Sequence, residues 1–503
     1  MIDFSNFFIY NINSSIIYLF AGVTQGEKFM SKYMSPITSD SLINLCSEIS
    51  INDKINVEDY NRYNVKRGLR NSDGTGVMAG LTRICSVDGY YIQDGERVPR
   101  PGMLKFRGLN VNDLVKGFRE DDRFGFEEVA WLLICGALPT KDQLEKFRNV
   151  LAECRELPED FIEDMIMKAP SANIMNKMSR SVLALYSYDD NPDDISVENV
   201  LRQCIQLIAQ LPSVMSYAYQ VKRRHFYKKS MYIHQPKPEL CTAQTILRTI
   251  RSDRMFTDEE AKLLDLCLIL HSEHGGGNNS TFATRVLTSS GTDTYSAIAA
   301  GIGSLKGPRH GGANIKVREM TSLMAEEISD ITNEGQVADY LKKIIHKQAG
   351  DGSGLVYGMG HAIYTMSDPR AVLLKAAAKD FIKNEEFARR FEQLELIEKL
   401  TPEIFRKEKG NMKPICANVD LYSGLIFDML GIPEDLFTPI FTVSRMAGWA
   451  AHRLEEISTG GRIIRPAYKN VALPNKYIAL ADRTEENVMH SDLYIPSEER
   501  FTF

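Results

Sequence analysis

Apolar residues recur every three to four positions along most of the chain, the spacing of amphipathic helices. Residues 126–138 show this pattern, Pro139 interrupts it, and residues 141–154 resume it. The same spacing predicts six further helices, at residues 197–219, 258–270, 315–328, 337–347, 371–400 and 421–430. We therefore predict a mainly α protein.

Strand signals are few. The clearest lie near residues 83–92 and 102–107, where a region with glycine and proline separates two short apolar stretches. This arrangement predicts a small sheet or hairpin. The basic and aromatic segment at residues 223–238 is interpreted as a connection between helices rather than a nucleic-acid patch, because no recognisable binding module surrounds it.

Composition narrows the function classes. The chain has 503 residues, 44% hydrophobic and 25% charged, which is typical of a globular protein and not of a disordered one. Its formal net charge of −6 provides no basic field for nucleic acid or an anionic membrane, so we predict neither partner. The eight cysteines lack paired spacing, which favours a reducing compartment and a cytoplasmic location.

The N-terminal segment at residues 7–23 is rich in apolar residues but is not interpreted as a leader or a membrane span. Its longest unbroken apolar run, residues 16–23, is far shorter than the roughly 20 residues that a spanning helix needs. No lysine or arginine precedes Lys28, so neither a signal peptide nor a transit peptide is indicated. Met30 is a candidate translation start, with the residues before it as an upstream extension.

Three histidines lie among glycines, in HSEHGGGNNS (271–280), GPRHGGAN (307–314) and GMGHAIY (358–364). Glycine permits tight turns and close approach of the backbone to a ligand, and free N–H groups near helix starts suit anions. A single histidine in such a loop is more often structural. Three loops of this kind together predict an active site built around His274, His310 and His361.

Arginines provide the second candidate set. Arg370 lies in the segment SDPR, Arg445 in the apolar run FTVSR, and Arg465 in GRIIRP. An internal salt bridge is the ordinary interpretation of each, but guanidinium groups also bind carboxylates through two parallel hydrogen bonds. Three that converge would bind a di- or tricarboxylate. Asp420 in NVDLYSG completes the set, with a helix cap as its ordinary interpretation.

These motifs resemble those of the citrate synthase family, and the resemblance covers residues 80–468. LKFRG (104–108) and FEEVAWLL (126–133) are similar to its N-terminal blocks. The three histidine loops, with DPR after the third, then NVDLYSG, FTVSR and IRP follow in the family's order and at similar separations. Six motifs in order make a chance similarity very improbable.

The resemblance implies a mostly helical, two-domain homodimer whose smaller domain closes over the cleft. We expect an N-terminal extension at residues 1–79, a large domain at 80–310 and 425–503, and a small domain at 311–424. It further implies condensation of acetyl-CoA with oxaloacetate to give citrate and CoA, with no cofactor beyond the substrates and no metal.

The resemblance also assigns roles to residues. His310 would hydrogen-bond the thioester oxygen, Asp420 would remove the methyl proton and His361 would polarise the keto group of oxaloacetate. Its carboxylates would be held by His274, Arg370, Arg445 and, from the partner subunit, Arg465. Candidates for the CoA and acetyl pocket are Gly358, Gly360 and Phe441.

Chemistry supports this division of roles. A carboxylate with a reference pKa of about 3.9 is too weak to deprotonate a thioester methyl unaided, so a donor must stabilise the oxyanion that forms. A preorganised donor contributes roughly 3 to 4 kcal/mol, and burial raises the pKa of the base. Where many relatives carry a basic residue for CoA phosphate this chain has Ala362 and Thr365, so no phosphate contact is assigned.

Three rival hypotheses remain open. The same scaffold supports 2-methylcitrate synthesis from propionyl-CoA, and one methylene in an apolar pocket discriminates by only about 1 to 3 kcal/mol. A metalloenzyme with the three histidines as ligands is disfavoured by their wide separation in sequence. A non-catalytic carboxylate-binding relative is disfavoured because every expected catalytic position is filled.

Overall fold

The computed structural model describes residues 55–71, 74–410, 414–472 and 477–484. The apolar segment at 7–23 and the hypothesis about Met30 lie outside these residues. Residues 70–467 form one compact unit, and the chain before and after them is assigned to another. In the described part of the second unit are helix α3 (Val57–Arg62) and the short turns Arg67–Leu69 and Leu480–Asp482.

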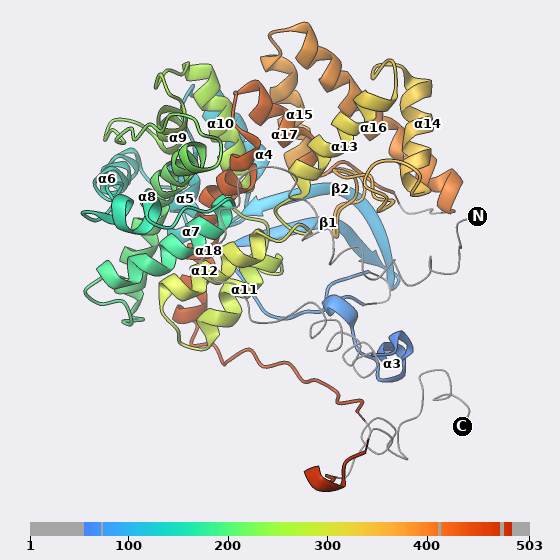
Figure 1. The fold of residues 1–503 in the computed structure, drawn as a ribbon, viewed down its shortest axis with the longest axis horizontal. Coiled ribbons are helices and arrows are strands. Elements are labelled where there is room, and N and C mark those ends of the chain that lie inside the picture. The colour runs from blue at the N-terminus through green and yellow to red at the C-terminus, as the bar shows by residue number, and fades with distance from the viewer. Residues whose placement is uncertain (1–54, 72–73, 411–413, 473–476, 485–503) are drawn as a thin grey trace. The chain divides into compact units, whose positions relative to one another are not determined.

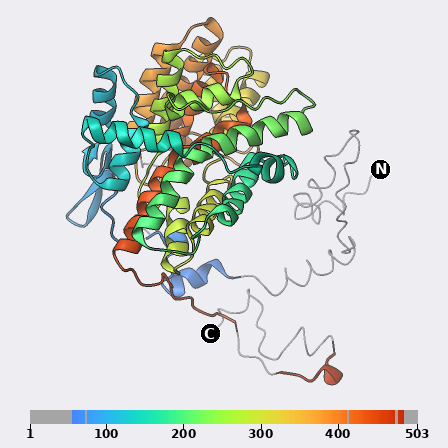
Figure 2. The same ribbon diagram turned by 90° about the vertical axis from the view of Figure 1, so that its left-hand side faces the viewer.

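The larger unit is mainly α, which confirms the predicted fold class (Figures 1 and 2). Its first group of helices is α4 (Val111–Glu120), α5 (Phe126–Cys135), α6 (Lys141–Glu153), α7 (Ile174–Leu185), α8 (Val197–His225), α9 (Thr242–Ile250), α10 (Asp258–His271), α11 (Asn279–Ser289) and α12 (Thr294–Leu305). The second is α13 (Ala313–Glu327), α14 (Glu334–Ile345), α15 (Pro369–Phe381), α16 (Glu385–Lys409), α17 (Asp420–Met429) and α18 (Phe437–Ser458).

Helix α18 lies at the centre of this unit. Every residue from Phe437 to Leu454 is buried, including Arg445, His452 and Arg453. The helix packs against α5, α8, α10, α11 and α12. Burial on all sides, rather than along one stripe, is characteristic of a core helix.

The sheet consists of β1 (Cys85–Gln93), β2 (Glu96–Phe106) and β3 (Leu109–Asn110), all antiparallel. Its register pairs Gln93 with Glu96 through the two-residue turn Asp94–Gly95, both of which have positive φ. The hairpin is confirmed. The expected long turn region before residue 102 was wrong, because β2 begins at Glu96 and contains two prolines. Both prolines are tolerated because β3 pairs only with the end of β2, so the rest of that edge of β2 has no strand partner that would need a backbone N–H.

The eight predicted helices are present with shifted ends, except that residues 371–400 form two helices rather than one. Helix α15 ends at Phe381 and α16 begins at Glu385. Asn384 caps the start of α16, where its side chain accepts a hydrogen bond from the Phe387 N–H (2.9 Å). The apolar spacing continues across this break, so periodicity alone missed it. The helix predicted at residues 126–138 is also too long, since α5 ends at Cys135 before Gly136, whose φ is 86°.

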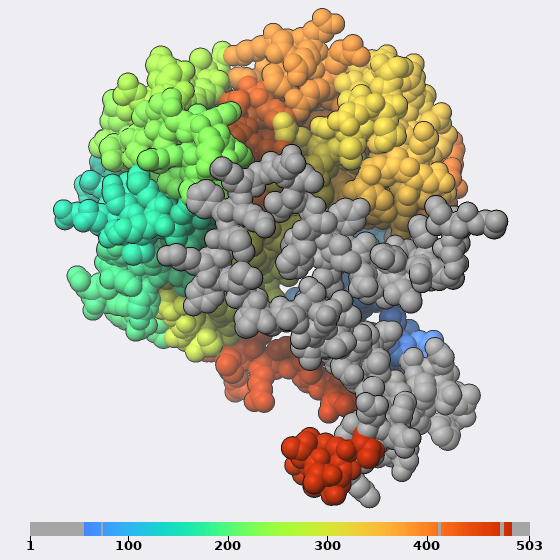
Figure 3. All heavy atoms as spheres, viewed as in Figure 1, coloured from blue at the N-terminus to red at the C-terminus, as the bar shows by residue number. Residues whose placement is uncertain are grey.

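Residues 226–241 connect α8 to α9, and only the first three residues of the basic segment belong to α8. The interpretation of that segment as a connection is therefore largely confirmed. In the space-filling view, the green part of the chain and the yellow-to-orange part from α13 to α16 occupy separate areas of the visible face (Figure 3). This separation is compatible with the expected small domain at 311–424, whose boundaries stay a prediction.

Candidate active site

Six of the predicted side chains converge on one place in the larger unit. His274 follows α10, His310 precedes α13, and His361 lies in the loop before α15. The imidazole rings of His274 and His361 are 5.0 Å apart, centroid to centroid. Arg370 at the start of α15 and Arg445 on α18 are close enough to lower the pKa of His274. Both arginines also act on Asp420, the first residue of α17.

His310 is held as a neutral donor by the start of α11. The backbone N–H of Ser280 donates to its Nε2 (3.4 Å), and the Ser280 hydroxyl lies 3.0 Å from the same atom. Because Nε2 accepts the backbone hydrogen bond, the ring proton belongs on Nδ1. Desolvation, and then the charge of Arg445, lowers the pKa of His310 to about 4, so the ring is neutral near pH 7.

His361 is held as the opposite tautomer. Its Nδ1 accepts the backbone N–H groups of Ile363 and Tyr364, both at 3.1 Å, so its proton belongs on Nε2. The ring stacks on Tyr364 with centroids 4.7 Å apart. Desolvation, and then the charge of Arg370, lowers its pKa to about 4. The site thus contains two neutral imidazoles, each with a defined N–H group.

His274 is buried, and its Nε2 has no hydrogen-bond partner. Desolvation lowers its pKa well below the usual value, and the charge of Arg370 lowers it further. An unpaired buried ring nitrogen costs free energy, so it is expected to gain a partner when a ligand binds.

The two buried arginines differ in their surroundings. Arg370 donates from Nε and a terminal nitrogen to the two oxygens of Asp368 (3.0 and 2.7 Å), so it does form an internal salt bridge. Arg445 donates from Nε to the carbonyl of His271 (2.7 Å), and both of its terminal nitrogens are buried without a partner. Desolvation lowers the Arg445 pKa to about 10, which leaves it charged. Two unpaired N–H groups on a buried cation are suited to bind a carboxylate.

Asp420 is not a helix cap. The N–H of Asp420 is instead bound by the side chain of Asn418 (3.0 Å), and Oδ1 of Asp420 is buried without a partner. Desolvation raises its pKa to about 6, an effect that the charge of Arg370 opposes and that of Asp368 reinforces. A carboxylate in this range is a stronger base than an exposed one and is still ionised near pH 7.

Gly358 and Gly360 shape the loop that carries His361. Both have positive φ, 80° and 91°. The Gly360 N–H donates to the carbonyl of Cys416 (2.8 Å), and the Asn418 N–H donates to the carbonyl of Gly358 (2.9 Å). A Cβ on Gly358 would lie 2.8 Å from the Leu421 side chain. These bonds join the His361 loop to the Asp420 loop, whereas a contact of either glycine with CoA stays a prediction.

Phe441 contacts both sides of the site. Its ring centroid lies 4.6 Å from that of His271 and 6.4 Å from that of His310, and the Arg445 guanidinium lies 4.8 Å from it. Arg465 is not brought into this group: its side chain is exposed and has no partner in the part of the chain that the structure describes. Its neighbour Ile464 donates to the Ser289 hydroxyl (3.0 Å).

Comparison with known proteins identifies the family. The model of the citrate synthase C-terminal domain matches residues 71–467. The chain belongs to the citrate synthase family. It is 32% identical over 425 residues to the citrate synthase of Synechocystis sp., covering 83% of this chain and 95% of that protein.

Two further relatives widen the comparison. The crystal structure of the Thermotoga maritima citrate synthase matches with a TM-score of 0.65 and 29% identity, covering 82% of this chain and 98% of that one. The 2-methylcitrate synthase 1 of Corynebacterium glutamicum is 29% identical, covering 84% of this chain and 99% of that protein. Citrate synthase family membership and the helical fold are therefore both established for this chain.

Sequence reasoning missed a buried polar chain behind the site of this citrate synthase family member. Arg285 donates to Nδ1 of His452 (3.0 Å), so Nε2 of His452 donates to Glu273 (3.1 Å). Glu273 lies in the HSEH motif, but His452 is within an apolar helix and carries no motif signal. Ser280 and Asn418 lie within the quoted motifs HSEHGGGNNS and NVDLYSG, but only the geometry reveals what they bind.

Two kinds of feature are absent from the described residues. No group of three or more His, Cys, Asp and Glu side chains there is arranged to hold a metal ion. No helix among them combines the length and the apolar character that crossing a membrane requires.

Proposed function

We propose that this chain condenses acetyl-CoA with oxaloacetate and water to give citrate and CoA. One observation carries the proposal: Asp420, a buried carboxylate with an unpaired oxygen, shares a site with two neutral imidazoles that have opposite fixed tautomers. An enolisation followed by an addition to a ketone needs one base and two separate oxyanion donors.

In the first step Asp420 removes a proton from the acetyl methyl group. The electron pair of that C–H bond forms the enol double bond, and the thioester oxygen gains negative charge. His310 donates a hydrogen bond to this oxygen from Nδ1, which Ser280 leaves free by occupying Nε2. A donor of this kind contributes about 10²- to 10³-fold to the rate.

In the second step the enol carbon attacks the keto carbon of oxaloacetate. The keto oxygen becomes an alkoxide and receives a hydrogen bond from Nε2 of His361. Water then cleaves the thioester of the citryl-CoA that forms, releasing citrate and the CoA thiol. No cofactor beyond the two substrates is required.

The carboxylates of oxaloacetate are bound by the cationic and neutral donors around the keto site. Arg445 supplies two buried N–H groups without a partner, and His274 supplies a buried Nε2. Arg370 is oriented by Asp368. Arg465, exposed in this chain, acts in the site of the partner subunit of a homodimer. We place the enzyme in the cytoplasm, with residues 311–424 as a mobile domain that excludes water.

The direct test is CoA thiol release from acetyl-CoA in the presence of oxaloacetate. We expect turnover that depends on oxaloacetate and survives exhaustive chelation of metals. Absence of turnover would contradict the proposal, and loss of turnover on chelation would favour the metalloenzyme instead.

Propionyl-CoA in the same assay addresses the second candidate, 2-methylcitrate synthesis, which similarity to the Corynebacterium glutamicum protein keeps open. The ratio of kcat/KM for the two thioesters decides between them. One methylene changes this ratio by about 10- to 200-fold, so we expect a preference for acetyl-CoA rather than complete exclusion of propionyl-CoA.

A further inference from the structure

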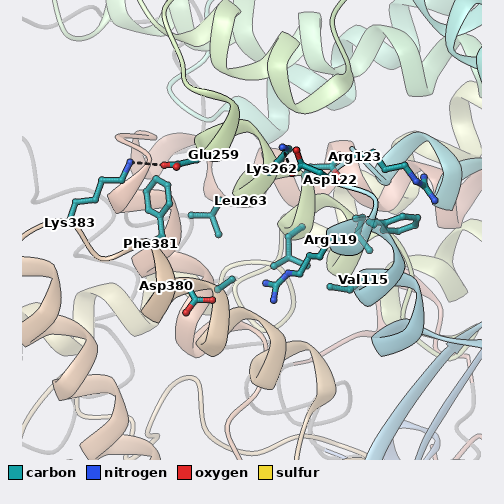
Figure 4. A pocket seen from close by; sticks show the side chains of 15 residues that line it. Val115, Arg119, Asp122, Arg123, Glu259, Lys262, Leu263, Asp380, Phe381 and Lys383 are labelled. Atoms are coloured by element: carbon teal, nitrogen blue, oxygen red, sulfur yellow. Dashed lines mark hydrogen bonds and ion pairs between the residues drawn. The ribbon is translucent and has the colours of Figure 1, made fainter.

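A cleft of about 400 Å³ lies between α4, α10 and α15, outside the site described above. Its volume is in the range of small-molecule sites in proteins. The cleft lies toward the start of α10, where Glu259, Lys262 and Leu263 line it, and toward the end of α15, where Ala377 and Asp380 line it (Figure 4).

The floor of the cleft is mainly apolar, with the buried Asp265 as the one acidic residue among the otherwise apolar buried lining residues. Val115 of α4, Leu263 and Leu266 of α10 and Ala377 of α15 line it and are otherwise buried. Phe381 adds an aromatic ring at one side (Figure 4). A surface of this kind gains free energy when a branched or aromatic side chain covers it.

Most charges on the rim already have partners. Lys262 pairs with Asp122 (2.6 Å) and Lys383 with Glu259 (3.2 Å). Arg123 pairs with Glu128 at 2.6 Å. These groups are therefore satisfied within the protein, and they are poor candidates to bind a ligand.

Two lining charges are different. Arg119 of α4 and Asp380 of α15 are exposed and have no side-chain partner among the residues that the structure describes. They come from opposite sides of the cleft, and the Arg119 guanidinium is directed toward the side from which Asp380 projects (Figure 4). One unpaired cation and one unpaired anion thus face a shared space above an apolar floor.

We propose that this cleft binds a small zwitterionic α-amino acid with a branched or aromatic side chain. Arg119 binds its carboxylate, Asp380 binds its ammonium group, and the side chain covers the floor formed by Val115 and Leu263. A free arginine prefers a carboxylate because its planar donors match the two oxygens.

Helices α10 and α15 connect this cleft to the active site. They pack against each other, and each is about 20 Å long. Helix α10 runs from the cleft to His271, three residues before His274, and α15 runs from Arg370 to the cleft. A ligand that spans α4 and α15 fixes the cleft end of this helix pair, so it alters oxaloacetate binding at the active-site end. This coupling between the two sites rests on the proposed function.

Binding is tested first, on the full chain, by titration calorimetry with L-leucine and L-phenylalanine at millimolar concentrations. We expect saturable binding of at least one. Three analogues of leucine serve as controls: 4-methylpentanoate lacks the ammonium group, leucinamide lacks the carboxylate, and glycine lacks the side chain. Each is expected to bind at least about tenfold more weakly. No binding of either amino acid, or equal binding of the analogues, overturns the proposal.

Variants then locate the site. Arg119→Gln and Asp380→Asn should each weaken binding about tenfold, because each removes a hydrogen bond to a charged group. The matched control is Lys116→Gln, which lies on α4 outside the cleft and pairs with Glu120. Circular dichroism checks the folding of all three. Unchanged affinity in both cleft variants overturns the proposal.

The effect on activity is measured separately, as the KM for oxaloacetate with and without saturating amino acid. We expect a shift that disappears in Arg119→Gln. If calorimetry shows binding but the KM is unchanged, the site stands and the coupling is wrong. If no turnover is found at all, the proposed function fails while the calorimetric result is unaffected.

Discussion

Asp420 provides the sharpest test at the scale of single residues. Replacing it with Asn keeps the volume but removes the base, so kcat should fall by about 10²- to 10⁴-fold with little change in stability. The matched control is Asp142→Asn, an exposed carboxylate on α6 that pairs with Lys146. Near-normal turnover of Asp420→Asn in the CoA release assay would contradict the assigned role.

The wild-type pH profile gives a second measure of the same residue. Asp420 must be ionised to accept a proton, and its pKa is raised to about 6. We therefore expect kcat/KM to rise with pH through about 6 and then level off. His310 and His361, with pKa values lowered to about 4, remain neutral across that range and do not obscure the step.

The grouping of the candidate side chains was predictable from sequence, but their chemical states were not. Glycine-rich surroundings in the sequence alone singled out His274, His310 and His361. For His310, the ring nitrogen that carries the proton is set by the backbone N–H of Ser280, which lies 30 residues away in the sequence at the start of α11. The raised pKa of Asp420 depends on burial by other elements, which no local pattern encodes.

At the scale of elements, the contact between the His361 loop and the Asp420 loop can be tested through Gly358. Changing Gly358 to Ala adds two costs: the strain of a positive φ, and a clash with Leu421 and Val317 at 2.8 to 2.9 Å. Strain alone costs about 1 to 2 kcal/mol. The clash should also displace the neighbouring His361, so both the melting temperature and kcat are expected to fall.

Gly352 supplies a matched control in the same region of the chain. Its φ is +72°, and a Cβ there would meet nothing within 4 Å. Gly352→Ala should therefore lower stability by the strain alone and leave kcat near the wild-type value. Equal kcat in Gly358→Ala and Gly352→Ala would show that close packing at residue 358 does not position His361.

Helices were predictable where apolar residues recur at helical spacing, as along the amphipathic α6 and along α10, which is buried on all sides from Leu263 onward. Helices α6 and α10 agree with prediction to within a residue or two at each end. The break between α15 and α16 was missed because apolar spacing continues across it and only Asn384 marks it. The long strand β2 was partly missed because its prolines suggested a turn, while the positive-φ pair Asp94–Gly95 forms the actual one.

At the scale of the whole molecule, the homodimer and the role of Arg465 in the partner's site remain predictions. Mixing two inactive variants, Asp420→Asn and Arg465→Gln, tests both. If Arg465 acts across the interface, a mixed dimer contains one site with both residues intact, so activity should reappear after co-expression. If Arg465 acts within its own chain, both sites of the mixed dimer are defective and activity stays absent.

The stability of the molecule should also depend on pH through Asp265, a buried residue of α10 whose carboxyl group lies at the start of α5. Asp265 accepts the N–H groups of Gly125 (2.7 Å) and Phe126 (3.3 Å), and the neighbouring Glu127 has one oxygen without a partner. Desolvation, and then the charge of Glu127, raises the pKa of Asp265 to about 8. Near pH 7 the folded state therefore retains a proton that the unfolded chain releases.

The sign of the resulting pH dependence follows from this difference in bound protons. Between about pH 6.5 and 8 the folded state binds more protons, so the free energy of unfolding falls as pH rises, by about 1 to 2 kcal/mol. Below about pH 6.5 the buried histidines act oppositely, because their pKa values are lowered. Toward pH 8 Lys177, whose pKa desolvation lowers to about 8, also acts oppositely, so the contribution of Asp265 is isolated by comparison with a variant of Asp265.

Urea denaturation across that window measures the effect. Asp265→Asn should flatten the slope, whereas Asp258→Asn, an exposed carboxylate at the start of the same helix α10, should keep it. A wild-type slope retained in Asp265→Asn would mean that another group holds the extra proton. A flattened slope would identify Asp265 as a buried acid that makes the fold less stable at mildly alkaline pH.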